Sequence, residues 1–597
     1  MEVVFNLHSF SSLLYLLLIP LFYLIIIKTI QSKHQQIHPG PRPFPLLGNL
    51  PQFLANRARF LDWTTDLLAA SPTGTIFIRR PWKPPMVITA NPSNVEHMLK
   101  SRFDNYPKGD RMSNALHDFL GSGIFNADGE RWKTQRKTAS FEFSTKSMRQ
   151  FVSEAVRDEI VHRLVPFLEA VADRGEVVNL QDALERFAFD NICRVAFDVD
   201  PACLGSGSSS GPGDFMSSFE AASELSVGRM RSAVPPLWRL KRLLNVGSER
   251  RLRSSIGTVH AFATDIIRSR MEEEASRGRS DLLSRFAEDG ESSEERLRDV
   301  VVSFILAGRD TTSSVLARLF WVLWSRPDVV EKIRAELKSI RGARSAEGGE
   351  GEVFEFEELK EMHYTHGAIS EALRLYPPVS VDSKLCASED VLADGTRVGK
   401  GWVVAYNAYA MGRMVSIWGK DCLEFRPERW IDAEGKYRAA ESPYKYPVFH
   451  AGPRMCLGRE MAYIQMKSVA AAVVERFDME VNDRTGTCGG HQRSLTLRMK
   501  GGLPPPPPPP PPISSVEAAA TTASSPSSDQ SELEHLKARP AVILERRTRI
   551  PRHRRVSKKY PLFLLLRKSK WRSHQRPWKR SGNLGRSIKW RFGAPCA

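Results

Sequence analysis

Residues 9–27 (SFSSLLYLLLIPLFYLIII) carry no charge over nineteen positions, and this stretch limits the architecture of the chain more than any other segment. A helix needs about 20 mainly apolar residues to cross a bilayer. A signal peptide would have a basic start and a small-residue cleavage site, whereas this start carries Glu2 and no Lys or Arg. Lys28 and Lys33 follow the stretch, so the positive-inside rule places the bulk of the chain in the cytoplasm. We therefore expect one uncleaved transmembrane anchor, residues 1–30.

The body after the anchor is expected to form one large domain. Residues 31–45 are a proline-rich hinge, because the prolines of HPGPRP exclude a helix and favour an extended connection. Residues 46–503 show mostly helical periodicity, which predicts a mainly α fold with a small β region and two flexible surface loops. The expected helices cover residues 145–171, 292–324, 329–340 and 459–477, the strands residues 75–78, 86–90 and 402–406, and the loops residues 205–213 and 341–351.

Residues 504–597 differ from the body in composition. The chain has a formal net charge of +18, but residues 513–597 hold 20 Lys and Arg against 5 Asp and Glu, so the body is nearly neutral. Nine prolines at residues 504–512 favour a polyproline II rod at the start of this tail. A basic arm for nucleic acid or acidic lipid is one interpretation. We favour a disordered extension or an incorrectly predicted gene end, and we expect no nucleic-acid partner.

A Gly- and Pro-containing segment, residues 449–458 (FHAGPRMCLG), presents a single cysteine directly before a helical pattern. Cys456 is therefore expected near a helix N-terminus, where free amides and the helix dipole lower the pKa of a thiol. A thiolate there can ligate one metal from one side, and Gly452 and Gly458 would let the backbone approach a flat cofactor closely. A lone cysteine is usually only structural, but the whole segment favours a ligand.

Two further patterns concern charged side chains. Glu371 and Arg374 lie three residues apart before two prolines, and Arg429 can complete a Glu–Arg–Arg network that is structural rather than catalytic. Trp132 and Arg136 lie four residues apart on one helix face, where they can clasp an anionic group. Taken alone, the second pair is more typical of a surface cation–π contact.

A polar segment, residues 307–312 (AGRDTT), interrupts the long helical pattern of residues 292–324. Glycine in the middle of a helix costs about 1 kcal/mol relative to alanine. Threonine hydroxyls there can bond the backbone and open the helix locally. Asp310 and Thr311 would then line a widened groove with a carboxylate and a hydroxyl, the groups that a proton relay needs.

The order and spacing of these segments resemble those of a cytochrome P-450, a haem-thiolate monooxygenase. The signature Phe449-x-x-Gly452-x-Arg454-x-Cys456-x-Gly458 carries most of the resemblance, and it extends over about residues 39–503. A closer resemblance is to the plant family 94, which includes fatty-acid ω-hydroxylases and jasmonoyl-isoleucine hydroxylases. The segments that carry it are residues 123–129 (GIFNADG), 141–146 (FEFSTK), 410–421 (AMGRMVSIWGKD) and 461–467 (MAYIQMK).

The resemblance implies a role for each matching residue. Cys456 would be the axial ligand of the iron of haem b, with Phe449 packed beside its sulfur. Trp132, Arg136 and Arg454 would hold the haem propionates by charge-assisted hydrogen bonds. The remaining roles are proton delivery during oxygen activation for Asp310 and Thr311, and a structural network behind the haem for Glu371, Arg374 and Arg429.

The resemblance also implies the reaction and its partners. The chain has no flavin or nicotinamide fingerprint, so O2 would be the co-substrate and electrons would come from a separate NADPH-dependent reductase. The expected activity is ω-hydroxylation of a fatty acid at the endoplasmic reticulum membrane, with oxidation of jasmonoyl-isoleucine as the alternative. A haem isomerase or dehydratase is a rival, although the acid–Thr pair and the cysteine segment are both intact. Residues 103–120 are expected to cover the substrate access path, where Lys108 or Arg111 could meet a carboxylate or simply face solvent.

Overall fold

The computed structural model describes residues 39–204, 213–277, 282–288, 293–346, 352–481, 491–499 and 564–568. The expected anchor, most of the expected hinge and most of the tail lie outside these residues. Within them, one helix, Glu294–Trp324, is long and apolar enough to cross a membrane. Because 83% of its most apolar window is buried inside the protein, this helix belongs to the core.

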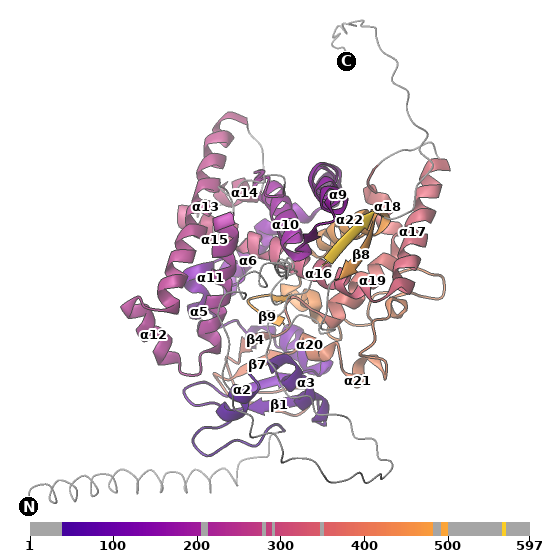
Figure 1. The fold of residues 1–597 in the computed structure, drawn as a ribbon. Helices are drawn as coiled ribbons and strands as arrows, with labels where there is room; N and C mark the ends of the chain where they lie inside the picture. Colours follow the sequence, from indigo (N-terminus) through magenta and orange to yellow (C-terminus); the bar gives the residue numbers. More distant parts are fainter. Residues whose placement is uncertain are drawn as a thin grey trace, which may run out of the picture.

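Helices dominate the described residues (Figure 1). The α-helices are α2 (Leu50–Ala55), α3 (Phe60–Ala70), α4 (Pro92–Glu96), α5 (Asp110–Leu120), α6 (Gly129–Ser140), α7 (Thr145–Gln150), α8 (Arg157–Glu159), α9 (Val165–Arg174), α10 (Leu180–Phe197), α11 (Gly213–Arg231), α12 (Pro235–Leu244), α13 (Ser248–Arg277), α14 (Leu282–Glu288), α15 (Glu294–Ile305), α16 (Thr311–Trp324), α17 (Pro327–Ala346), α18 (Phe356–Glu361), α19 (His363–Leu375), α20 (Ala408–Met411), α21 (Val415–Trp418) and α22 (Arg459–Arg476). Short π and 3-10 helices join them: η1 (His97–Ser101), η2 (Phe103–Asn105), η3 (Phe141–Phe143), η4 (Phe151–Val156), η5 (Ile160–Leu164), η6 (Leu306–Asp310), η7 (Pro427–Trp430), η8 (Pro447–Phe449) and η9 (Gly452–Arg454).

The strands form small sheets, the largest of which has four strands in the order β1-β2-β7-β4. β2 and β7 are parallel, with Val87 opposite Val404, and the other neighbours in this sheet are antiparallel. Strand β11, which belongs to the tail, pairs with β3 and β8. The strands are β1 (Thr75–Ile78), β2 (Met86–Thr89), β3 (Val177–Val178), β4 (Asp382–Leu385), β5 (Asp390–Val391), β6 (Arg397–Val398), β7 (Val403–Tyr406), β8 (Phe477–Val481), β9 (His491–Arg493), β10 (Leu497–Met499) and β11 (Leu564–Lys568).

Local sequence signals account for several helix ends. The Ser293 side chain accepts a hydrogen bond from the backbone of Arg296 and begins α15. A reciprocal capping box between Glu355 and Glu358 begins α18. Gly175, in the left-handed conformation with φ 62°, ends α9. These signals explain why the expected helices appear close to their predicted positions.

Two expectations about the helices need correction. The expected helix over residues 145–171 is helical throughout, but the π segments η4 and η5 interrupt it. Part of the expected loop over residues 341–351 is instead the last turns of α17, which ends at Ala346. Arg341 explains this extension, because its guanidinium binds both carboxylate oxygens of Glu475 at 3.0 Å. The expected loop over residues 205–213 falls almost entirely outside the described residues.

Three hydrophobic clusters form most of the core. One joins α10, α16, α17, α19 and α22, a second joins α5, α11, α13 and α15, and a third underlies the four-stranded sheet. Figure 1 shows this sheet with α2 and α3 at one end of the molecule and the long helices at the other. The segment α15-η6-α16 contributes to the first two clusters, and it therefore links the two helical halves of the body.

Candidate functional site

The cysteine segment forms a tight series of turns between η8 and α22. The Cys456 amide donates a hydrogen bond to the Phe449 carbonyl oxygen at 2.8 Å, which closes the loop. The ring of Phe449 packs against the first core cluster and lies 5.3 Å from the ring of Tyr463. Gly458 precedes the first residue of α22, so Cys456 lies at the N-terminal end of that helix as predicted.

The acidity of Cys456 differs from the expectation. Burial raises the pKa of its thiol, although the backbone N–H of Gly458 and the cations Arg136 and Arg459 act in the opposite direction. Helix-terminal amides are therefore present as predicted, but the loss of hydration outweighs them. The side chain is nevertheless accessible. The thiol is therefore surrounded by much protein and yet not covered by it, so another group can reach the sulfur.

Gly452 has a structural reason for lacking a side chain that the sequence did not reveal. Its φ is 66°, and a Cβ atom there would lie 2.0 Å from the backbone oxygen of Leu99 in η1. The close approach is therefore to the protein's own backbone. At Gly458 a Cβ atom would lie 3.3 Å from the ring of Phe143, a much milder contact.

Trp132, Arg136 and Arg454 meet as the sequence predicts. Trp132 is buried in α6, with the Arg454 guanidinium carbon 4.3 Å and the Arg136 guanidinium carbon 6.0 Å from its ring centroid. Arg454 forms an ion pair with Asp128 at 2.5 Å and donates to the Ala127 carbonyl at 3.1 Å. Arg136 has no carboxylate partner among the described residues.

A second charged group beside Arg454 was missed in the sequence. Asp382, at the start of β4, lies 2.8 Å from Lys384, 3.6 Å from Lys108 and 3.4 Å from His450. Burial favours the neutral acid, but Lys108 and Lys384 hold the pKa of Asp382 well below its usual value. Burial lowers the pKa of Lys384 to about 7, and repulsion from Arg454 adds to this. A charged residue at alternate positions of a short strand (DSKL) was the available signal.

The helix that carries Asp310 and Thr311 opens locally, as predicted. The turn between α15 and α16 is the π segment η6, and the Thr311 hydroxyl donates to the Ala307 carbonyl at 2.8 Å. At Gly308 a Cβ atom would lie 2.6 Å from Ile192 of α10, so glycine also permits close helix packing. Asp310 is only 4% exposed, whereas Thr311 is half-buried.

Asp310 belongs to a buried ion-pair chain that the sequence did not predict. Its carboxylate lies 3.0 Å from Arg309, which in turn lies 3.2 Å from Glu185 of α10. Arg498 of β10 pairs with the same Glu185 and, at 2.7 Å, with Glu220 of α11. Burial raises the pKa of Asp310, and Arg309 and Arg498 partly oppose this. Because η6, α10, α11 and β10 all contribute to this ion-pair chain, no local sequence motif indicates it.

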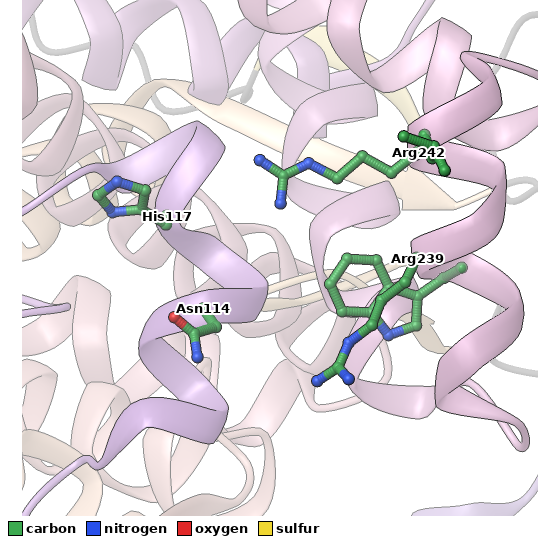
Figure 2. Close-up of a pocket in the computed structure, with 6 residues that line it drawn as sticks. Asn114, His117, Arg239 and Arg242 are labelled. Carbon is green, nitrogen blue, oxygen red and sulfur yellow. The ribbon is translucent and has the colours of Figure 1, made fainter.

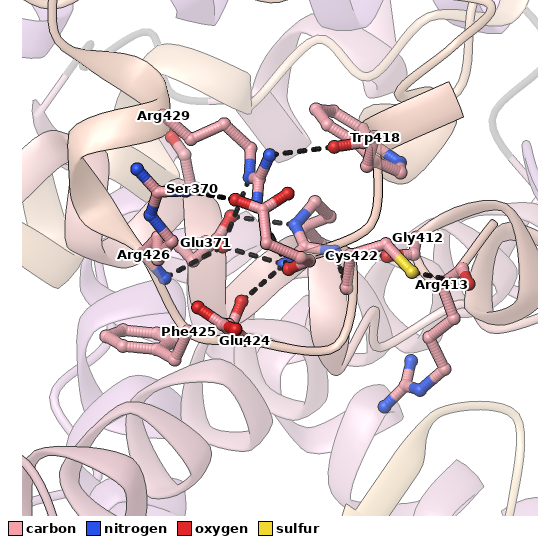
Figure 3. Close-up of polar contacts among 12 residues, drawn as sticks. Ser370, Glu371, Gly412, Arg413, Trp418, Cys422, Glu424, Phe425, Arg426 and Arg429 are labelled. Carbon is pink, nitrogen blue, oxygen red and sulfur yellow. Dashed lines mark hydrogen bonds and ion pairs between the residues drawn. The ribbon is translucent and has the colours of Figure 1, made fainter. Parts of the chain in front are cut away.

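Glu371, Arg374 and Arg429 also meet, at the centre of a closed hydrogen-bond network (Figure 3). Glu371 and Arg374 are fully buried and form two hydrogen bonds of 2.7 Å, and the Arg429 Nε lies 3.4 Å from the same carboxylate. The indole of Trp430 and the backbone N–H of Arg426 supply the remaining donors to Glu371. Arg374 donates to the backbone carbonyls of Gly412, Cys422 and Glu424.

A separate surface pocket of about 560 Å³ lies between α5 and α12 (Figure 2). Asn114 and His117 line it from α5, and Trp238, Arg239 and Arg242 from α12. Arg242 is paired with Asp118 at 2.8 Å. None of the predicted site residues lines this pocket, so it is distinct from the site built around Cys456.

Comparison of the sequence with known proteins agrees with the geometry of this site. The family model for cytochrome P450 matches residues 38–502. The chain is 51% identical over 457 residues to cytochrome P450 CYP94D108 of Paris polyphylla, and the aligned region covers 76% of this chain and 90% of that protein. It is 43% identical over 471 residues to cytochrome P450 94A1 of Vicia sativa (78% and 89%) and 44% identical over 476 residues to cytochrome P450 94B1 of Arabidopsis thaliana (77% and 91%).

The chain therefore belongs to the cytochrome P450 family, and its resemblance to family 94 is confirmed. It is a P450 monooxygenase that depends on haem, O2 and electrons from an NADPH-dependent reductase. Its mainly helical fold with small sheets is the one predicted.

Two observations test whether the residues present suit a haem. First, the thiol of Cys456 is accessible although it is surrounded by protein, so its sulfur is free to ligate an iron atom. Second, the described residues around Arg454 have an excess of basic groups: Arg136, Arg454, Lys108 and Lys384, whose pKa is lowered to about 7, face the two carboxylates of Asp128 and Asp382. The two propionates of a haem carry the two negative charges that would balance this group. The residues therefore fit the cofactor.

Proposed function

We propose that the chain hydroxylates an aliphatic carboxylate at or near its methyl end, with a fatty acid as substrate. The balanced reaction is R–H + O2 + NADPH + H⁺ → R–OH + H2O + NADP⁺, with electrons delivered by the separate reductase. The observation that carries the proposal is the likeness to family 94 across most of the chain, together with the intact cysteine segment. Bound haem supplies the oxygen activation.

Each residue of the site has a proposed role. Cys456 provides the thiolate ligand, and Phe449 shields its sulfur and accepts its backbone N–H. Trp132 orients Arg136 and Arg454, whose positive charges hold the propionates. Gly452 and Gly458 allow the tight turns of the cysteine segment.

Asp310 and Thr311 are proposed to deliver protons to the reacting centre. The hydroxyl of Thr311 is bound to the opened turn of η6, where it can pass a proton while the helix stays intact. Burial raises the pKa of Asp310, which makes its carboxyl group a better proton acceptor than a solvated aspartate, although Arg309 and Arg498 partly oppose this. It must leave its contact with Arg309 to reach Thr311.

Glu371, Arg374 and Arg429 are proposed to be structural, because every charged edge of the Glu371–Arg374 pair is satisfied within the protein. We further propose the following organisation: a membrane anchor at residues 1–30, a proline-rich hinge at 31–45, the haem domain at 46–503, and a polyproline and basic tail at 504–597 that is a disordered extension or an incorrectly predicted gene end. The anchor would hold the chain at the endoplasmic reticulum membrane with the haem domain on the cytoplasmic side.

Titration of the ferric haem spectrum tests the substrate class. The purified full-length protein is titrated with fatty acids of several chain lengths and, separately, with jasmonoyl-isoleucine, and products are identified after turnover with the reductase. We expect a saturable spectral change and an ω-hydroxy product with fatty acids. A response to jasmonoyl-isoleucine alone would replace the fatty acid as substrate, and a response to neither would refute the proposal.

A second experiment tests proton delivery. Thr311→Ala is expected to lower the hydroxylated product formed per NADPH consumed by about 100-fold, because proton delivery contributes about 10²–10⁴ to such rates. Asp310→Asn should act in the same direction. The exposed Thr134→Ala of α6 is the control and should leave this ratio unchanged. Unchanged coupling in both test variants would remove the role of this pair.

A further inference from the structure

Three cations, Arg80, Lys83 and Arg111, form a cluster that the site around Cys456 does not use. Arg80 and Lys83 lie in the connection between β1 and β2, and Arg111 lies in the first turn of α5. None of the three forms an ion pair with any residue that the structure describes. We call this group the open cationic cluster.

Burial makes the absence of a negative partner costly. Arg80 is 7% exposed and its guanidinium carbon lies 4.5 Å from the centroid of the Phe53 ring, while Lys83 and Arg111 are half-buried. Lys83 donates a hydrogen bond to the Met230 carbonyl at 2.9 Å, a neutral partner at the end of α11. Buried cations are normally paired, so three unpaired cations in one place indicate a site for an anion.

The electrostatics show that the three groups act on one another. Burial and, to a smaller extent, repulsion from Arg80 and Arg111 together lower the pKa of Lys83 to about 7. Burial also lowers the pKa of Arg80 to about 10, with repulsion from Arg111 in the same direction. The contacts of α11 agree with this arrangement: Lys83 donates to the Met230 carbonyl, and the adjacent Arg229 donates to the Ala115 carbonyl, one turn along α5 from Arg111. The cluster therefore lies where the β1–β2 connection, α11 and the start of α5 meet, and a bound anion would relieve its repulsion.

The neighbouring lysine, Lys108, has a different environment. It lies three residues before Arg111, but it pairs with Asp382 at 3.6 Å in the charged group beside Arg454. Of the two cations expected near the substrate access path, Lys108 is therefore neutralised by the protein and Arg111 is not.

The position of α5 connects the open cationic cluster to the site. The backbone N–H groups of Lys108 and Gly109, just before α5, donate to Asp128, which is the ion-pair partner of Arg454. At the other end of α5, the Ser122 backbone donates to Asp299 of α15 at 2.7 Å. Helix α5, which presents Arg111, is about 16 Å long. It runs from the neighbourhood of Asp128, the partner of Arg454, to α15, which leads to Asp310 and Thr311.

We propose that Arg80, Lys83 and Arg111 bind the carboxylate of the aliphatic substrate. This rests on the proposed function, in which oxidation at the methyl end requires the acid group to be held away from the reacting carbon. Two guanidinium groups offer the planar pairs of donors that match a carboxylate, and Lys83 adds a third positive charge. Phe53 supplies an apolar surface beside Arg80.

The test compares an acid with its uncharged counterpart. Dodecanoate and methyl dodecanoate are titrated calorimetrically into the full-length holoenzyme and into Lys83→Gln and Arg111→Gln. Each variant is expected to weaken dodecanoate binding by about 10-fold or more and to leave the ester unchanged, since a hydrogen bond to a charged group contributes on this scale. Arg111→Lys should restore part of the affinity. The exposed Arg79→Gln, on the same connection, is the matched control.

The outcomes separate the two proposals. Equal weakening of acid and ester, or no weakening, would overturn the carboxylate site even if ω-hydroxylation were observed. Acid-selective weakening without any hydroxylated product would retain the site and refute the proposed function. A lipid headgroup could offer similar chemistry, so flotation with phosphatidylserine and phosphatidylcholine vesicles is measured in parallel. Loss of phosphatidylserine binding in the variants, with dodecanoate binding intact, would also overturn the proposal.

Discussion

Glu371 and Arg374 are fully buried and each is hydrogen-bonded on all sides, whereas Arg80, Lys83 and Arg111 lie together with no carboxylate partner in the part of the chain that the structure describes. Both groups contain charges that are at least partly removed from water. Their difference lies in charge balance. In the Glu371–Arg374 network every charge is already paired, so no charged group is left to bind a ligand. In the open cationic cluster the unpaired charges lower the stability of the fold but can bind an anion.

The largest effect is expected in the closed network. Glu371→Gln should destabilise the fold by about 3–5 kcal/mol, because it leaves Arg374 buried with an uncompensated charge. Thermal unfolding, with the reduced carbon-monoxide spectrum as a measure of intact haem ligation, checks this. Glu357→Gln removes an exposed carboxylate from a surface ion pair and should change little. Similar stability of the two variants would contradict the distinction between the buried network and an exposed ion pair.

A third kind of buried ionisable group, held neutral rather than paired, gives the next effect. His366 is stacked between Tyr437 and Tyr463, and burial lowers its pKa to about 2. Because the folded pKa lies below the unfolded value near 6.5, stability is retained above pH 6.5 and falls by at most about 1.4 kcal/mol per pH unit below it. Denaturant unfolding between pH 7 and 4.5 measures this slope. His366→Gln should be less sensitive to acid than the parent, and an equal slope would exclude this cause.

A smaller effect is expected in the charged group beside Arg454. Arg136→Gln removes one of two surplus positive charges, so haem should dissociate about tenfold more readily, which corresponds to about 1.4 kcal/mol. Haem transfer to an acceptor protein measures the rate. Lys137→Gln, which alters an exposed cation one residue later, is the control. Equal rates in the two variants would show that Arg136 contributes nothing to holding the cofactor.

The smallest effect has the opposite sign. Lys83→Met should raise the stability of the ligand-free protein by about 0.5–1 kcal/mol, because it removes repulsion between unpaired cations. Chemical unfolding without added substrate detects the change. Lys100→Met, which removes a lysine paired with Glu96 on the surface, should give no such gain. A loss of stability in Lys83→Met would mean that this lysine is structural and that the two groups do not differ as described.

Patterns of adjacent residues predicted much of this site. The spacing of Glu371 and Arg374 on one helix turn indicated their contact, and the Gly and Thr residues of segment 307–312 indicated the open turn η6. The position of Cys456 before α22 followed from its Gly- and Pro-containing loop. The raised pKa of the Cys456 thiol could not be predicted from the loop, because desolvation depends on how much protein surrounds the sulfur.

The sequence by itself determined the family, the mainly helical fold and the order of the motifs, because the pattern within each segment and the spacing between segments can be read along the chain. Only the tertiary structure decided which charges are paired. Arg309 meets Glu185 and Lys108 meets Asp382, while Arg80, Lys83 and Arg111 have no carboxylate partner among the residues that the structure describes. Ion pairing depends on distances of a few ångströms between segments far apart in the chain, and these distances exist only after the helices have packed.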